Sequence, residues 1–131
     1  MASTQKIINS STTHALISAQ SSGNSSGVDK EIVEMSDIGG TNDTSVVAIE
    51  YIEYSLIPNK QLLIEFSKAD ADSTSNDDTI YEVYGQGKFG SPGRRISKDL
   101  NAAGAFDRIK FKFAQDCAGS CLILLRKVSG F

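Results

Sequence analysis

Residues 107–113 read DRIKFKF, and the alternation in this stretch decides the fold class. Three apolar residues alternate with three basic ones, Ile109, Phe111 and Phe113 with Arg108, Lys110 and Lys112. Successive side chains of a β-strand point to opposite faces of its sheet. The pattern therefore predicts a strand with one face in a core and a basic face toward solvent or a partner.

The neighbouring sequence repeats this strand character in both directions. Residues 46–57 (VVAIEYIEYSLI) and 60–67 (KQLLIEFS) flank Pro58-Asn59, a turn signal that predicts a hairpin. Residues 79–84 form a further strand candidate, and 121–128 (CLILLRKV) are apolar enough for a central strand buried on both faces. No apolar residues recur at helical spacing over a dozen positions. We expect an all-β fold, an antiparallel β-sandwich or small barrel of about six to eight strands.

The first 45 residues differ in composition from the rest. They contain 15 Ser or Thr residues and only scattered apolar ones, with Gly-rich hinges at 21–27 (SSGNSSG) and 39–40. We therefore divide the chain into a polar N-terminal arm, 1–45, and a β-sandwich core domain, 46–131. An arm with short extended segments can add a strand to a partner's sheet edge. The candidate partner-binding positions in it are Ile7, Ile8, Leu16, the Ile17-Ser18 pair, Ile32 and Val33.

Length and charge limit the classes of protein to which this chain can belong. A chain of 131 residues is expected to be one domain. No apolar run is long enough for a membrane span. The N-terminus does not have the pattern of a secretory signal, and we therefore expect synthesis in a cytoplasm. The net charge of -3 argues against nucleic-acid binding. Acidic residues dominate 46–82 and basic residues dominate 85–131. Either strands of opposite sign pair within one sheet, or a dipolar surface supports self-association.

Motifs that carry chemistry lack their required context. Gly85-Gln-Gly-Lys-Phe-Gly90 matches G-x-G-x-x-G, but no helix follows to hold a pyrophosphate, so we expect a tight bend there. Cys117 and Cys121, at the expected tip of a last hairpin, are predicted to be thiols. They are too sparse for a zinc site with His14, which is expected to be solvated.

Acidic residues do not form a recognisable site either. The loop around 70–78 lacks the glycine and terminal Glu of a calcium loop. Glu50 and Glu53 have opposite parity on one strand, which places them on opposite faces. Tyr51 and Tyr54, like Tyr81 and Tyr84, also differ in parity, so one of each pair is expected in the core. The sequence predicts no enzyme, no cofactor and no metal.

The order of features resembles that of small β-sandwich structural proteins of tailed bacteriophages. The resemblance lies in a polar arm followed by four motifs: VVAIEYIEYS at 46–55, QLLIEF at 61–66, VYGQGKF at 83–89 and LILLRK at 122–127. Similar sequences often carry a Trp near the first two core strands. This chain has none, and Phe66 or Tyr54 is expected to fill that space.

The resemblance implies a head-decoration or cement protein on the capsid surface of a virion, made in the host cytoplasm. Its partners would be the major capsid protein or other virion proteins, together with further copies of itself, and not nucleic acid or a membrane. Neck and tail proteins share such β-sandwiches. A second hypothesis is a glycan-binding β-sandwich that uses exposed tyrosines and the acidic loop.

Overall fold

The protein is a sandwich of two antiparallel sheets in a computed structural model that describes residues 3–41, 44–67, 78–99 and 106–131. The five-stranded sheet has the order β1-β2-β9-β4-β7, and the four-stranded sheet has the order β3-β8-β5-β6. The strands are β1 Ser3–Ser10, β2 His14–Ser22, β3 Asp29–Glu34, β4 Val46–Leu56, β5 Gln61–Ser67, β6 Asp78–Tyr84, β7 Gln86–Gly90, β8 Arg108–Phe113 and β9 Ala118–Ser129. A single turn of 3-10 helix, η1 (Met35–Ile38), follows β3. The predicted all-β sandwich is thus confirmed, with nine strands in the described residues.

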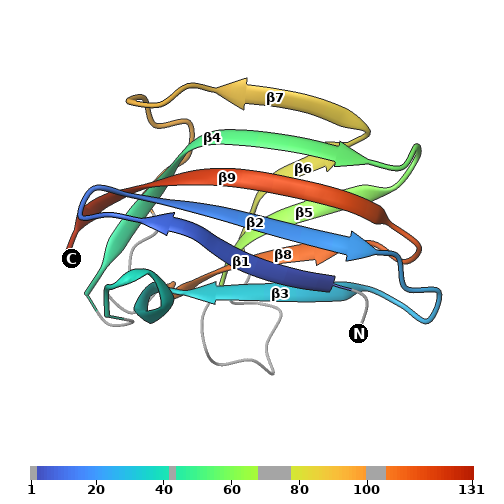
Figure 1. Cartoon of the computed structure of the whole chain (residues 1–131), viewed down its shortest axis with the longest axis horizontal. Coiled ribbons are helices and arrows are strands. Elements are labelled where there is room, and N and C mark those ends of the chain that lie inside the picture. Colours follow the sequence, from blue (N-terminus) through green and yellow to red (C-terminus); the bar gives the residue numbers. More distant parts are fainter. Residues whose placement is uncertain (1–2, 42–43, 68–77, 100–105) are drawn as a thin grey trace.

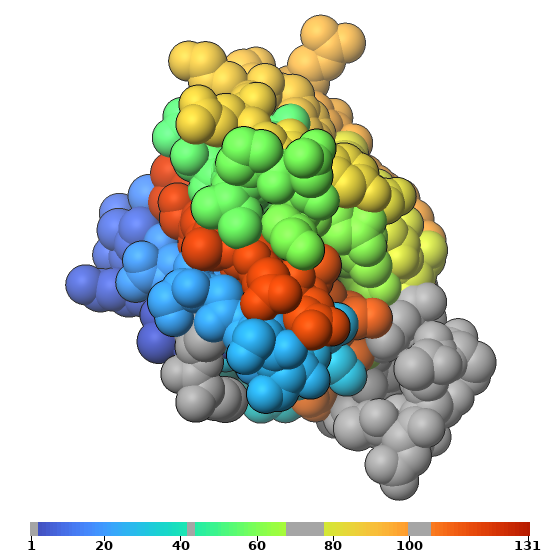
Figure 2. Space-filling view, turned by 90° about the vertical axis from the view of Figure 1, so that its right-hand side faces the viewer, coloured from blue at the N-terminus to red at the C-terminus, as the bar shows by residue number. Residues whose placement is uncertain are grey.

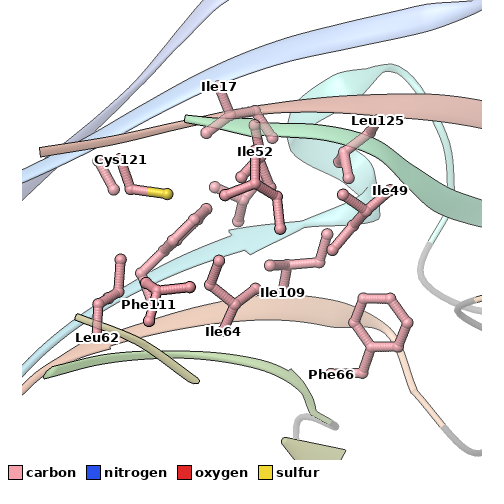
Figure 3. Packing of buried hydrophobic residues seen from close by; sticks show 14 of the residues in the cluster. Ile17, Ile49, Ile52, Leu62, Ile64, Phe66, Ile109, Phe111, Cys121 and Leu125 are labelled. Atoms are coloured by element: carbon pink, nitrogen blue, oxygen red, sulfur yellow. The ribbon is translucent and has the colours of Figure 1, made fainter. Parts of the chain in front are cut away.

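The core lies between the two sheets, as the alternation in β8 predicts. Figure 1 shows the five-stranded sheet in front of the four-stranded one. Ile109, Phe111 and Phe113 of β8 are fully buried, and Figure 3 shows side chains of both layers meeting between them. Tyr54 and Tyr81 pack against this core, whereas Tyr84 is 52% exposed. The expectation of one core tyrosine in each pair is therefore confirmed.

Short connections join the two sheets, and this corrects the predicted pairing. β4 pairs with β7 and β9, while β5 pairs with β6 and β8, so the turn at Pro58-Asn59 does not close a hairpin. β8 and β9 likewise belong to different sheets. In both cases the short connection leads from one sheet to the other, because a tight turn reverses the chain equally well within one sheet or between two.

The first third of the chain is built into both sheets. β2 pairs along its whole length with β9, and β3 pairs with β8. Ile17 and Val33 are fully buried. Met35 and Ile38 of the helical turn are also buried, with at most 1% of their surface exposed. The predicted boundary at residue 45 therefore does not separate an arm from a core, because the described residues before it supply three strands of the sandwich.

The last strand is central but is buried on one face only. β9 lies between β2 and β4, and Cys121, Ile123 and Leu125 point into the core. Leu122 and Leu124 point outward and are half-buried. The predicted burial of both faces is wrong, because the outer face of this sheet carries no second layer.

Opposite charges pair within the four-stranded sheet. Arg108 of β8 donates to Glu34 at 2.8 Å, and the Lys112 ammonium lies 3.7 Å from the buried Glu65 carboxylate on β5. The second pair joins the acidic segment 46–82 to the basic segment 85–131, which favours the interpretation that strands of opposite sign pair within one sheet.

Turns from distant parts of the chain gather at one end of the sandwich. Figure 2 shows the green turn after β4, the orange-red start of β9 and the blue segment after β2 side by side. Ile57 N–H donates to Ala118 C=O at 2.9 Å, and Asp116 N–H donates to Asn24 C=O at 3.0 Å. This end is therefore tied together by backbone hydrogen bonds. No helix in the described residues is long and apolar enough to cross a membrane.

Candidate functional site

The outer face of the five-stranded sheet carries a row of uncharged polar side chains. The register places one such residue from every strand side by side, and we call this set the polar row: Thr4, Gln20, Ser120, Ser55 and Gln86. All five are exposed. Within the described part of the chain, none of these side chains has a hydrogen-bond partner. The row therefore presents free hydroxyl and amide groups across the whole sheet.

One hollow of this face, which we call the main hollow, lies on the β7 side of the row. Its volume is about 620 Å³. Strands β2, β9, β4 and β7 all contribute to its lining, which consists of Ser18, Glu53, Tyr54, Ser55, Gln86, Gly87, Lys88, Ser120, Cys121 and Leu122. Such a volume is in the range of small-ligand sites, which combine apolar surface with a few placed polar groups. Leu122 supplies the apolar surface.

Two charges of opposite sign face each other at this hollow. Glu53 on β4 is directly opposite Lys88 on β7. The Tyr51 hydroxyl donates to Glu53 at 2.8 Å, and this bond is the main reason that the pKa of Tyr51 is raised, with burial adding to it. The carboxylate is thus oriented by Tyr51, and the pair adds no net charge to the face.

A β-bulge explains why the alternation of residues in β4 predicts the wrong sheet face for Glu50. The register of β4 against β9 shifts between Ile49 and Tyr51, so Glu50 is an extra residue. Its carboxylate contacts His14 and Arg126, which lie on the outer face, and Glu50 therefore points to the same side as Glu53. The predicted opposite faces for Glu50 and Glu53 are wrong, because a bulge reverses the parity of the residues after it.

The Glu50 carboxylate ties four segments together. It is fully buried, with Oε1 at 2.9 Å from His14 Nε2 of β2 and at 2.9 Å from the amide N–H of Gly93. Arg126 of β9 lies 3.6 Å from Oε2. His14 is thus hydrogen-bonded to a buried carboxylate and only partly exposed, which corrects the expectation of a solvated histidine.

A hydroxyl, an imidazole and a carboxylate follow one another at this cluster. Thr13 Oγ1 lies 3.0 Å from His14 Nδ1, and His14 Nε2 lies 2.9 Å from Glu50. A nucleophile also requires a cavity for a substrate beside it. The main hollow does not include Thr13, His14 or Glu50. We therefore assign a structural role to the cluster of Thr13, His14 and Glu50. The absence of enzyme activity stays a prediction.

The glycine motif makes a bend, as predicted. Gly85 has φ +67° between β6 of the four-stranded sheet and β7, which enters the five-stranded sheet beside β4. A Cβ at Gly87 would lie 2.6 Å from the Tyr54 hydroxyl, and one at Gly90 would lie 2.2 Å from the Glu50 carbonyl oxygen. The glycines thus allow β7 to lie close against β4 and to form one wall of the main hollow.

Both cysteines are buried thiols. Burial raises the pKa of Cys121 to about 12 and also raises the pKa of Cys117, which Lys60 lowers in part. The thiolate is the reactive form of cysteine. At pH 8 we therefore expect iodoacetamide to label neither thiol in the folded protein and both in 6 M guanidinium, as read by mass spectrometry. Rapid labelling of Cys121 under native conditions would contradict its burial.

The sequence-predicted partner positions do not form one surface. Ile17 and Val33 are core residues, whereas Ile8 and Ile32 are 49% and 38% exposed on different sheets. The remaining three are divided in the same way, Leu16 and Ser18 on the outer face of β2 and Ile7 packed against the core. Leu16 and Ser18 lie on the face of the main hollow, and Ser18 lines it.

Residues 68–77, which make up most of the acidic loop, are outside the described part of the chain. The structure therefore does not test the calcium-loop interpretation. Within the described ranges, no group of three or more His, Cys, Asp or Glu side chains is placed to hold a metal ion.

Comparison with known proteins identifies no family. No family model matches the chain, and no curated protein matches it. Among solved structures, a family 11 carbohydrate-binding module from Clostridium thermocellum in complex with a β-1,3-1,4-mixed-linked tetrasaccharide is similar at 12% identity and a TM-score of 0.42, over 97% of this chain and 83% of that one. A mutant of a family 29 carbohydrate-binding module has 12% identity and a TM-score of 0.42, over 95% and 91% of the two chains. At these values the likeness assigns no function to this protein.

Proposed function

We propose that this protein is a non-catalytic β-sandwich that binds carbohydrate on the outer face of its five-stranded sheet. The observation that carries the proposal is the polar row, whose five uncharged side chains have free hydrogen-bonding groups and adjoin the main hollow.

The chemistry of this face suits a sugar. A pyranose presents many hydroxyl groups, each a donor and an acceptor, and serine hydroxyls and glutamine amides are also donors and acceptors. Leu122 in the main hollow and Tyr51, two residues before Glu53 on the same face of β4, offer apolar surface to the C–H faces of the ring. The Glu53 carboxylate adds a strong acceptor for sugar hydroxyls.

A protein partner suits this face less well. The centre of a protein–protein interface is enriched in aromatic residues and methionine and depleted in serine. The main hollow instead has three serines among its lining residues, Ser18, Ser55 and Ser120. Capsid decoration through an arm also requires the first 45 residues to be available, whereas β1, β2 and β3 are strands of the sandwich.

The expected result is a loss of sugar binding when the main hollow loses a donor. Wild type is first screened on a glycan array and then titrated calorimetrically with the best binders, starting from cellohexaose and a mixed-linked β-1,3-1,4 tetrasaccharide. Gln86→Ala removes an exposed amide from the hollow, and we expect about a tenfold loss of affinity, equivalent to about 1.4 kcal/mol.

The matched control is Gln61→Ala, which removes the same side chain from β5 in the other sheet. Its affinity is expected to equal that of wild type. An array without binding, or an equal loss in both variants, would contradict a site on the outer face of the five-stranded sheet.

A further inference from the structure

The hollows of this face continue beyond the site proposed above. A second hollow of about 460 Å³ is lined by residues of β1, β2 and β9, including Thr4, Gln20 and Ser120. Ser120 lines the main hollow as well. The second hollow therefore begins where the main one ends and carries the polar row onward to β1.

A third hollow extends the same surface toward the turn after β4. Its volume is about 450 Å³, and its lining includes Ser55 and Gln86, which also line the main hollow, and Gly119, which also lines the second. The three hollows thus adjoin one another and contain every member of the polar row. Figure 1 shows all five strands of this sheet lying side by side, so the row crosses them from one edge to the other.

From this geometry, and resting on the proposed function, we infer that the ligand is an uncharged, linear oligosaccharide that lies across the strands along the polar row. Neighbouring strands are about 4.8 Å apart, so five strands span about 19 Å, the length of roughly four pyranose rings. A monosaccharide or a disaccharide would leave the β1 end of the row empty.

The charges on the face favour an uncharged chain. The polar row contains no ionisable side chain, and Glu53 and Lys88 in the next row are opposite in sign and directly opposed. An acidic sugar in every unit would find two ammonium groups, Lys88 and the exposed Lys6 at the β1 end of the same row, for several carboxylates and would also be repelled by Glu53. Binding of an uncharged chain is also expected to change little between 50 mM and 500 mM salt, because no net charge is neutralised.

The test compares chain lengths of one sugar type. Cellobiose, cellotetraose and cellohexaose are titrated calorimetrically into wild type, together with a tetrameric uronate. We expect affinity to rise at least tenfold from two to four units, to level off from four to six, and to be at least tenfold lower for the uronate. Gln20→Ala is expected to remove most of the gain from two to four units, because Gln20 lies in the second hollow and not in the main one.

The outcomes separate this inference from the proposed function. If cellobiose and cellohexaose bind equally well, or Gln20→Ala weakens both alike, the five-strand site is wrong and sugar binding stands. If the uronate binds best, the inference that the ligand is uncharged is wrong. If neither the array nor any of these probes shows binding, both the inference and the proposed function fail. A folding control for Gln20→Ala is an unchanged thermal midpoint.

Discussion

Removal of residues 1–45 is expected to leave a chain that does not fold. The truncated protein would lose β1 and β2 from one sheet and β3 from the other, together with the buried Ile17, Val33, Met35 and Ile38. β9 and β8 would then become edge strands with apolar faces exposed to water, a condition that promotes aggregation. Circular dichroism and amide NMR dispersion of the purified 46–131 fragment measure the result. An autonomous arm and core would instead give a folded fragment with wild-type β content.

A pair of adjacent substitutions tests, in the full-length chain, whether β2 is part of the core. Ile17 is fully buried in the core, whereas Leu16 beside it is half-buried on the outer face of β2. Ile17→Ala is expected to lower the free energy of unfolding by about 2–5 kcal/mol, and Leu16→Ala by clearly less. Chemical denaturation of both variants gives the two values. Equal and small losses would mean that β2 contributes little to the core.

The fold class was predictable because it depends on local alternation. Ile109, Phe111 and Phe113 point inward as their spacing requires. The pairing of strands was not predictable, because Pro58-Asn59 reverses the chain equally well within one sheet or between two. In β2, Ala15, Ile17 and Ala19 also alternate as core positions. The serine-rich composition around them hid this pattern, and small alanines give a weak apolar signal.

The candidate site was less predictable than the fold. Thr4, Gln20, Ser55, Gln86 and Ser120 are scattered over the sequence, and each alone is an ordinary surface residue. Only the register of five strands brings them into one row. Parity arguments also fail for residue pairs that span the bulge at Glu50, such as Glu50 and Glu53, because the bulge adds one residue that the sequence pattern does not reveal.

Gly90→Ala is expected to destabilise the protein strongly and to abolish sugar binding. Gly90 has φ +88°, and a Cβ there would lie 2.2 Å from the Glu50 carbonyl oxygen and 3.0 Å from Ile96 Cδ1. Neither the left-handed conformation nor the backbone of β4 can accommodate an alanine without movement. We expect a loss of about 3 kcal/mol or more, since the strain of a positive φ adds to displacement of β7 from β4. Gln86 and Lys88 would then leave the main hollow.

The matched control is the glycine at the other end of β7. Gly85 also has a positive φ, +67°, but a Cβ there would meet no atom within 4 Å. Gly85→Ala is therefore expected to cost only the strain of the left-handed backbone, about 1–2 kcal/mol, and to retain sugar affinity. Denaturation and cellohexaose titration of both variants separate the two causes. Equal losses would show that close packing of β7 on β4 is not what Gly90 provides. A stable Gly90→Ala protein that still binds sugar would show that the β7 wall of the main hollow is not needed for the site.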